Sequence, residues 1–517
     1  MKKQLPIMKF LFSLIVLQAG FSTQAQDTNI TFNRIKARIN ARNPMFHNPK
    51  THRAAFEVPA GSWINSIYAA NWWLAADGPD NTKVVACDTY GGNAHDFVCG
   101  PVANVYDSAY TKRWEKVWVV SRTEIQSHLA NYQTWGYITP ASIAEWPAHG
   151  DTTNGEPWLV APFFDADHDG KYIPMNGDYP AIRGDVAAFV VRNDMGAPKT
   201  STGSAPMNIQ LSMLFYGYNN SSEVLGNTLF LHTELVNTGS QSLTGLKMGM
   251  WANFELGNPY DNYIGTDSLN QAIYMYNADN NDEDWSEKGY GTTPPVQAFA
   301  FLNTNLVNSV DYRLSGQGSF YHEQPSTPLH YYYYLHNRYK DGRDFPSEFV
   351  YGGNPDGSSG ECEGSSNNMS GMRFIVGIAD RGDLAPGQSV CTDGAFVWSR
   401  ADNGNNLTSV AEMKNNLVSV KTFYQAQTAN ACDFESGVHE FQQDLHFNIY
   451  PNPAKHEFMV QIDAGQDLNS VGLYNSIGQL VFQGKEPKVK VESLPSGLYV
   501  VRIITSKGTA SQSVVVE

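Results

Sequence analysis

Aspartates at alternate positions give the strongest chemical signal in this chain of 517 residues. Asp165, Asp167 and Asp169 alternate with Ala and His, and Gly170 follows directly. Three acidic side chains at this spacing can surround one cation with oxygen atoms, and the glycine permits a sharp turn, as in the first half of a calcium loop. The pattern therefore predicts a calcium ion bound in a loop.

The rest of that segment departs from a complete hand-like calcium loop, which carries a carboxylate at its twelfth position. Asn176 occupies that position, and the next carboxylates are Asp178 and Asp185. Loop and strand patterns flank the motif, so we expect calcium to stiffen a surface loop rather than to drive a regulatory sensor. The alternative is a solvated acidic turn whose aspartates cap backbone N–H groups. The predicted ligands are Asp165, Asp167, Asp169, Asp178 and Asp185.

A second stretch rich in acids and amides runs from residue 255 to residue 267. Its oxygen atoms could bind another cation, and the alternative is a long loop with Asx turns. The neighbouring acidic run 279–284 is interpreted as charge that faces solvent. The weaker candidate ligands are Glu255, Asn258, Asp261 and Asp267.

The chain contains no catalytic motif with a defined spacing: it has no His-Glu-x-x-His helix, no Gly-x-Ser-x-Gly elbow and no phosphate-binding loop. A glycosidase needs only two carboxylates across a cleft. The chain has 51 acidic residues, so the sequence leaves such a catalytic pair possible. We therefore name no catalytic residue.

Aromatic residues are the positive indication of binding. In a strand, the tyrosine run 331–334 would point two rings to each face, so that Tyr331 and Tyr333 could offer a platform to sugar rings. The alternative is burial, because aromatic side chains are common in strands and cover large areas.

The elements that position these residues are predicted to be mainly β. Segments 211–218 and 228–236 alternate as half-buried strands do, which favours an antiparallel β-sandwich or jelly-roll-like core with a few helices. Capping boxes at Ser121–Glu124 and Ser409–Glu412 predict two helix starts. The second is followed by an apolar stripe typical of core packing, formed by Val410, Met413, Leu417, Val420 and Tyr424.

The first 25 residues read as a secretory signal. Lys2, Lys3 and Lys9 precede or flank an apolar run, and Thr23-Gln24-Ala25 offers small residues to a signal peptidase. The chain has 35 Lys+Arg against 51 Asp+Glu, a net charge of −16, which argues against a nucleic-acid binder. No apolar run reaches the length of a membrane span. We expect a secreted core at 26–432, with one or two subdomains, and a linker at 433–446.

An exported protein meets an oxidising compartment, which favours disulfides. The spacing of the five cysteines predicts the pairs Cys87–Cys99 and Cys362–Cys391 and leaves Cys432 next to the linker. Zinc is the competing interpretation, and no Cys-x-x-Cys or neighbouring His pair supports it.

The C-terminal segment consists of short β-branched and aromatic runs separated by Pro or Gly, as in a small antiparallel sandwich. Its blocks are Phe447-Asn-Ile-Tyr-Pro-Asn-Pro453, Val471-Gly-Leu-Tyr-Asn-Ser-Ile-Gly-Gln-Leu-Val481, Leu494-Pro-Ser-Gly-Leu-Tyr-Val-Val-Arg-Ile503 and Ser513-Val-Val-Val-Glu517. From about residue 445 onward, the pattern resembles the type A C-terminal sorting domain of the type IX secretion system in Bacteroidota. The resemblance implies an Ig-like sorting domain at 447–517, recognition by the type IX machinery, and either attachment to surface lipopolysaccharide or release.

The central region resembles a large family of exported Bacteroidota proteins without an established activity. The resemblance rests on blocks such as Ala161-Pro-Phe-Phe-Asp-Ala-Asp-His-Asp-Gly-Lys-Tyr-Ile-Pro174 and Tyr260-Asp-Asn-Tyr-Ile-Gly265, and it implies no catalytic residue. Ser108 and Ser268 lie in three-residue stretches that resemble the O-glycosylation sequon of such proteins.

From these observations we expect a cell-surface protein at the exterior of the outer membrane, adhesive or structural, with calcium-stabilised loops and an unknown glycan or protein ligand. A glycan-binding protein or a polysaccharide-degrading hydrolase is the alternative.

Overall fold

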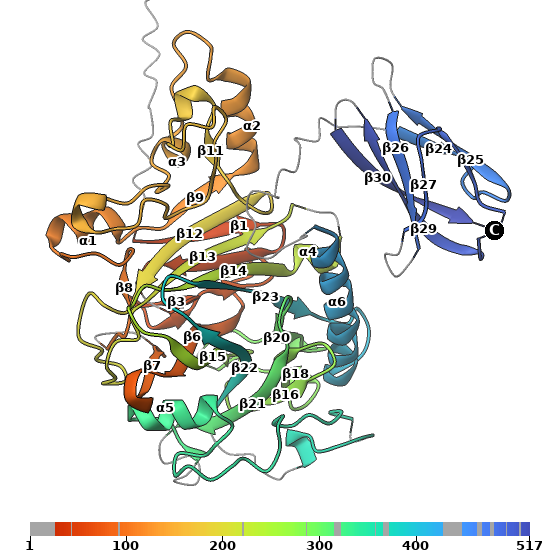
Figure 1. The fold of residues 1–517 in the computed structure, drawn as a ribbon. Helices are drawn as coiled ribbons and strands as arrows, with labels where there is room; N and C mark the ends of the chain where they lie inside the picture. The colour runs from red at the N-terminus through yellow and green to blue at the C-terminus, as the bar shows by residue number, and fades with distance from the viewer. Residues whose placement is uncertain are drawn as a thin grey trace, which may run out of the picture.

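The computed structural model describes residues 26–42, 44–90, 94–219, 222–285, 287–314, 322–356, 358–365, 372–427, 447–462, 468–475, 480–492, 494–505 and 508–516. The predicted signal segment 1–25 and linker 433–446 lie outside these residues. The core is built from two large antiparallel sheets, and a smaller β domain follows it in the chain (Figure 1). The predicted fold class, mainly β with a few helices, is confirmed.

The first large sheet has eight strands. In spatial order they are β1 (Asp27–Phe32), β2 (Ile35–Asn40), β5 (Phe56–Glu57), β6 (Asn65–Asp77), β15 (Leu243–Phe254), β22 (Arg373–Leu384) and β21 (Leu306–Arg313), with β7 (Lys83–Cys87) paired to β6.

The second large sheet has nine strands. In spatial order they are β16 (Asn262–Asp267), β17 (Ala272–Asn277), β20 (Val296–Phe301), β23 (Ser389–Ser399), β14 (Thr228–Asn237), β13 (Ile209–Gly217), β12 (Val186–Asn193) and β8 (Val98–Cys99), with β9 (Trp118–Ser121) paired to β12.

The main hydrophobic core lies between these two sheets. Trp72 on β6 packs edge-on against Phe299 on β20, with the ring centroids 5.9 Å apart. The indole N–H of Trp72 also donates a 2.9 Å hydrogen bond to the hydroxyl of Thr233 on β14. A buried indole needs such a partner, so this bond helps to fix how one sheet lies on the other.

The two strands predicted at 211–218 and 228–236 are confirmed as β13 and β14, but β13 is buried at every position rather than half-buried. The reason is that the outer face of the nine-stranded sheet is covered as well. Helix α6 (Asn406–Gln427) packs there with its predicted stripe, and all five stripe residues are buried. Helix α6 begins four residues before Val410, the first helical position that the capping box predicts, because Asn405 caps it and accepts from the backbone N–H of Thr408 at 2.9 Å.

The outer face of the eight-stranded sheet is covered by helix α5 (Pro328–Leu335). This helix contains the tyrosine run for which a strand and a ligand platform were predicted, and that prediction is wrong. Thr327 caps the helix and Pro328 occupies its first turn. Tyr331 is 3% exposed and packs edge-on against Trp73 at 4.9 Å, while Tyr333 is half-buried against the same cluster.

A lobe formed by residues 101–182 projects from the nine-stranded sheet (Figure 1). The capping box predicted at Ser121–Glu124 lies in this lobe and is confirmed. The side chains of Ser121 and Glu124 each accept from the other's backbone N–H at the start of α2. Its elements are α1 (Ser108–Trp114), β9, α2 (Arg122–Asn131), α3 (Ala141–Ala144), β10 (Phe163–Phe164), β11 (Tyr179–Pro180) and two short 3-10 turns, Thr152–Asn154 and Pro174–Asn176.

The described core also contains short elements, namely α4 (Glu223–Gly226), the 3-10 turns Pro79–Asn81 and Glu363–Ser365, and the two-stranded pairs β3 (His47–Asn48) with β4 (Arg53–Ala54) and β18 (Asn281–Asp282) with β19 (Gly291–Thr292).

The C-terminal domain contains a three-stranded and a four-stranded antiparallel sheet around its own buried core. Phe458, Val471, Val501 and Val514 are fully buried there, which is consistent with the predicted small β-sandwich. The strands are β24 (Phe447–Tyr450), β25 (Glu457–Ile462) and β28 (Lys488–Lys490), and then β27 (Leu480–Gly484), β26 (Leu468–Tyr474), β29 (Gly497–Thr505) and β30 (Gly508–Val516).

The predicted disulfide pairs Cys87–Cys99 and Cys362–Cys391 are wrong. Cys87, Cys99 and Cys362 are buried free thiols. Cys87 lies in the cluster under α5 and Cys99 in the core between the large sheets, so the fold separates two residues that are close in sequence. Cys391 on β23 is disulfide-bonded, and none of the other described cysteines is its partner.

Among the described residues, no helix is both long enough and apolar enough to cross a membrane.

Candidate functional site

The predicted calcium motif forms a closed loop in the lobe, and a two-stranded ladder holds its ends together. Phe164 on β10 is paired with Tyr179 on β11. Asp165 follows the first strand and Asp178 precedes the second, so this ladder places two carboxylates thirteen positions apart beside each other.

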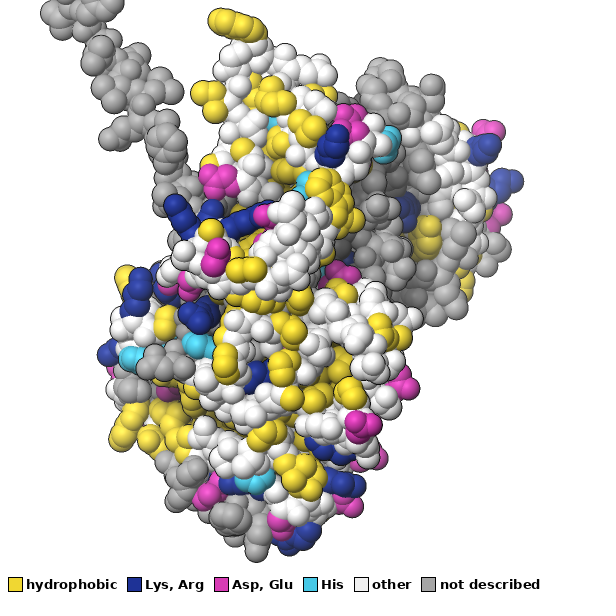
Figure 2. All heavy atoms as spheres, turned by 60° about the vertical axis from the view of Figure 1, so that its left-hand side comes forward, with side chains coloured by type: hydrophobic (Ala, Val, Ile, Leu, Met, Phe, Trp, Pro, Cys, Tyr) yellow, Lys and Arg dark blue, Asp and Glu magenta, His cyan; other side chains and the backbone are white. Residues whose placement is uncertain are grey.

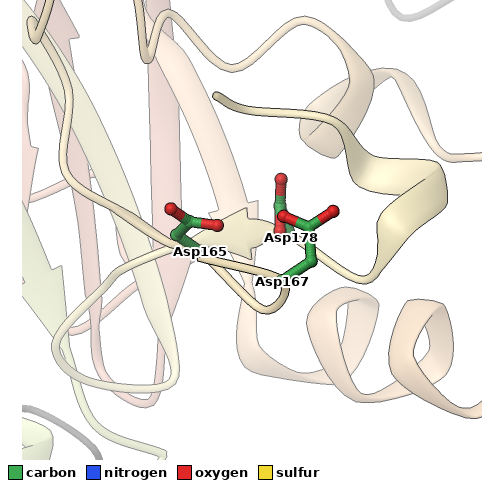
Figure 3. A group of neighbouring side chains, drawn as sticks. All are labelled: Asp165, Asp167 and Asp178. Atoms are coloured by element: carbon green, nitrogen blue, oxygen red, sulfur yellow. The ribbon is translucent and has the colours of Figure 1, made fainter. Parts of the chain in front are cut away.

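Three aspartates converge in this loop (Figure 3). One carboxylate oxygen from each of Asp165, Asp167 and Asp178 lies within 4.8 Å of the others. Within the part of the chain that the structure describes, this is the one group of acidic, His or Cys side chains with the spacing of a metal site. We refer to it below as the aspartate cluster.

Asp178 is the buried member of the aspartate cluster and ties the loop together. One of its oxygens accepts from the backbone N–H of Ala166 at 2.8 Å, and the other accepts from that of Ile173 at 2.7 Å. Burial raises the pKa of Asp178, the two N–H groups partly offset this, and the carboxylates of Asp165 and Asp167 raise it further.

The carboxylates of Asp165 and Asp167 accept local hydrogen bonds and could also bind a cation. Oδ2 of Asp165 accepts from the N–H of Gly170 at 2.8 Å, whereas its buried Oδ1 has no hydrogen-bond partner among the described residues. Burial opposes ionisation of Asp165, but the N–H groups that it accepts from outweigh burial and lower its pKa. Asp167 accepts from the N–H of Asp169 at 3.3 Å and from the amide of Asn176 at 2.7 Å.

Two of the five predicted ligands lie outside the aspartate cluster. Asp169 is exposed and accepts from the N–H of Lys171 at 2.8 Å, as an Asx turn does. Asp185 stands before β12, where it accepts from the N–H of Asn219 at 2.7 Å and lies 3.7 Å from Arg122.

The second predicted set of ligands does not form a group of this kind. Asp267 caps a turn by accepting from the backbone and side-chain N–H groups of Asn270. Asn258 accepts from the N–H of Tyr260 at 3.2 Å. Burial raises the pKa of Asp261 to about 7, and the neighbouring Glu283 contributes. Glu255 instead lines a separate cavity.

The two candidate glycosylation residues differ in accessibility. Ser108 is exposed at the first position of α1, behind the capping residue Asp107. Ser268 is half-buried in the turn between β16 and β17.

Sequence reasoning missed the aromatic residues that reach the surface near Glu255. Trp63, Tyr260 and Trp285 are 75%, 43% and 64% exposed. Trp285 directly follows the acidic run that was interpreted as solvent-facing charge, and a tryptophan beside such a run was the available signal. They line two adjoining hollows.

The C-terminal domain identifies the export route. Residues 448–517 match the family model described as a secretion system C-terminal sorting domain. The protein carries a type IX secretion sorting tail. This tail directs it to the cell surface or the extracellular space, and it implies contact with the type IX secretion machinery.

Comparisons over the rest of the chain find only distant structural similarity. No curated protein matches the sequence. A polysaccharide lyase structure is 10% identical over 63% of this chain with a TM-score of 0.21, and the match spans only 38% of the lyase. A putative aldose 1-epimerase from Escherichia coli K12 is 8% identical, with 72% of this chain and all of the epimerase covered and a TM-score of 0.26. Neither likeness is close enough to carry an argument about this protein.

Proposed function

We propose that the exported core is an adhesive or structural protein of the cell surface, and that calcium bound at the aspartate cluster orders its contact lobe. The observation that carries this proposal is the coincidence of the cluster with exposed apolar side chains in one lobe. Attachment of the protein to surface lipopolysaccharide and O-glycosylation at Ser108 and Ser268 belong to the same proposal.

The cluster suits calcium better than a transition metal, because all of its donors are carboxylate oxygens. Three carboxylates gathered within 4.8 Å repel one another, and a divalent cation would remove that repulsion. The partnerless Oδ1 of Asp165 supports a ligand at this point, since a buried oxygen without a donor is costly. Calcium would supply structural order to the loop.

The contact surface is suggested by exposed apolar residues in the same lobe as the aspartate cluster. Trp135 is 99% exposed, Ile138 is 86% exposed and Leu159 is 63% exposed. Hydrophobic side chains stand on the surface of this lobe, at the top of Figure 2. Such side chains favour contact with a partner over contact with water.

The loop and this apolar surface are physically linked. The indole N–H of Trp158 donates to the carbonyl of Gly170 at 3.2 Å, and the hydroxyl of Thr139 contacts the sulfur of Met175 at 3.5 Å. Ordering the loop therefore also orders the side chains beside it.

Retention of the full chain on immobilised matrix proteins and polysaccharides tests the proposal, with released fragments read in the same samples. We expect retention in calcium without fragments, and loss of retention with a chelator or with the double substitution Trp135→Ala and Ile138→Ala. Tyr450→Ala, an exposed aromatic in the sorting domain, is the matched control. Released sugar fragments would favour the hydrolase alternative, and retention that survives both the chelator and the lobe variant would overturn the role of the lobe.

A further inference from the structure

A cavity of about 610 Å³ opens beside Glu255, where β4 and β6 meet the loop that follows β15. Glu255 is 5% exposed, and its Oε2 has no hydrogen-bond partner among the described residues. A buried carboxyl oxygen without a partner is costly unless a ligand or water satisfies it. This cavity therefore contains an unused hydrogen-bonding group at its wall.

Flat aromatic surfaces stand at the mouth of the cavity. Trp285 and Tyr260 line it and meet edge to face, with ring centroids 5.7 Å apart. Both are well exposed, so a ligand in the cavity can reach them.

An adjoining hollow of about 400 Å³ shares Thr51, Arg53 and Glu287 with the cavity and is lined by Trp63. Trp63 has a φ of 63°, a conformation that bulky residues rarely adopt. Its backbone N–H donates to Glu57 at 2.8 Å, and the ammonium of Lys36 lies 5.1 Å from its ring. These contacts hold a 75% exposed indole in a fixed place, as a preorganised binding surface requires. We call the two hollows together the tryptophan groove.

Most charged side chains that line the tryptophan groove form ion pairs, whereas Lys288 in the second hollow donates to the carbonyl of Ser62 at 3.4 Å. Arg53 lies 3.6 Å from Glu287, and Lys36 lies 2.9 Å from Glu57. Arg38 in the second hollow lies 2.6 Å from Asp27. A strongly anionic or cationic ligand would have to compete with these ion pairs, so the groove favours an uncharged ligand with many hydrogen-bonding groups.

We propose that the tryptophan groove binds an uncharged oligosaccharide, with sugar rings stacked on Trp63 and Trp285 and a hydroxyl group bonded to Glu255. A pyranose ring has a C–H face that packs on an indole and hydroxyl groups at its edge that hydrogen-bond to carboxyl groups. Sites of this kind combine apolar walls with a few well-placed polar groups. The carboxyl group of Glu255 is neutral at mildly acidic pH, because burial and the nearby Glu287 raise its pKa to about 7.

The tryptophan groove is built from strands β1 to β6, from the loops that contain Trp63 and residues 255–260, and from Trp285 and Glu287, and it shares no residue with the aspartate cluster. Failure of calcium binding would therefore leave this proposal intact, and failure of saccharide binding would leave the aspartate cluster intact.

Titration calorimetry on the full chain tests the proposal, with neutral gluco-, manno- and xylo-oligosaccharides, a uronic-acid oligosaccharide and an apolar peptide as the probes. We expect at least one neutral oligosaccharide to bind. Trp285→Ala and Trp63→Ala should each weaken that binding by about tenfold or more, Glu255→Gln should retain it at pH 6, and Glu255→Lys should abolish it.

Tyr450→Ala is the matched aromatic control and should bind as the wild type does, and far-ultraviolet circular dichroism of each variant checks that it is folded. Binding of the uronic-acid probe or the peptide alone would overturn the ligand class. No binding of any neutral oligosaccharide, or binding that the two tryptophan variants leave unchanged, would overturn the site.

Discussion

The side-chain amide of Asn176 donates a 2.7 Å hydrogen bond to Oδ2 of Asp167. Asn176 stands at the twelfth position of the loop, where a hand-like calcium loop carries its last carboxylate. The amide therefore supports one of the three carboxylates of the aspartate cluster, and Asp178, two residues later, completes the cluster.

Replacing Asn176 with Asp should strengthen calcium binding. The new carboxylate would add a charged oxygen next to Asp167, and calcium affinity rises with the number of charged ligands. We expect an affinity increase of about tenfold in a calorimetric titration of the full chain. In chelator the same variant should unfold at a lower temperature, because the added charge repels Asp167. Asn176→Ala removes the amide without adding charge, and an equal affinity for both variants would contradict this prediction.

Asp178→Ala should destabilise the lobe even without calcium. The substitution leaves the N–H groups of Ala166 and Ile173 without their acceptor in a closed loop. We expect a loss of about 2–4 kcal/mol from two unsatisfied donors, measured by urea denaturation in chelator. The exposed Asp169 provides the control, since Asp169→Ala removes one local bond at the surface. A loss for Asp178→Ala no larger than that for Asp169→Ala would count against the bridging role.

Three cysteines should behave as unreactive thiols. Burial raises the pKa of the Cys99 thiol to about 12 and that of Cys87 well above its ordinary value, so little thiolate forms near neutral pH. Mass spectrometry after alkylation should detect label on Cys87, Cys99 and Cys362 only once the chain is denatured. Cys391 should need a reductant first. A cross-linked Cys87–Cys99 peptide from unreduced protein would contradict the fold of this region.

Glu255 should make stability depend on pH. Its folded pKa of about 7 exceeds its ordinary value of 4.5, so the neutral acid is the form that the fold favours. Its contribution is therefore fully present below about pH 4.5 and is lost as pH rises toward 7.

We expect the stability of the wild type, relative to Glu255→Gln, to fall by about 3 kcal/mol between pH 4.5 and pH 8 in urea denaturation. The other charged or titratable side chains lining this cavity are the same in both proteins and cancel in the difference, namely Glu287, Arg53, His52, Tyr68, Tyr90 and Tyr260. A difference that stays constant with pH would show that Glu255 keeps an ordinary pKa.

Local patterns predicted much of the fold. The strands 211–218 and 228–236 and the stripe on α6 are set by side-chain periodicity, which the sequence displays directly. The three aspartates of the cluster could be named because the motif is short and its last member follows within one loop.

Features that depend on distant partners could not be predicted in the same way. Tyr331 belongs to a helix because Thr327 and Pro328 start one, and its ring is buried by Trp73, more than 250 residues away. Cys87 and Cys99 are close in sequence but lie in different core clusters. The tryptophan groove joins Trp63 to Trp285 only after β4, β6 and the later loops have packed together.

Thermal unfolding of the full chain during a calcium titration tests the central claim most directly, with the double variant Asp165→Asn, Asp167→Asn beside the wild type. At calcium a hundredfold above the dissociation constant, binding should stabilise the wild type by about 2.7 kcal/mol and raise its Tm. The double variant should show no calcium-dependent rise, and it should unfold at or above the wild-type temperature in chelator because two repelling charges are gone. A wild-type Tm that calcium leaves unchanged, or an equal rise in the double variant, would contradict a calcium-ordered lobe.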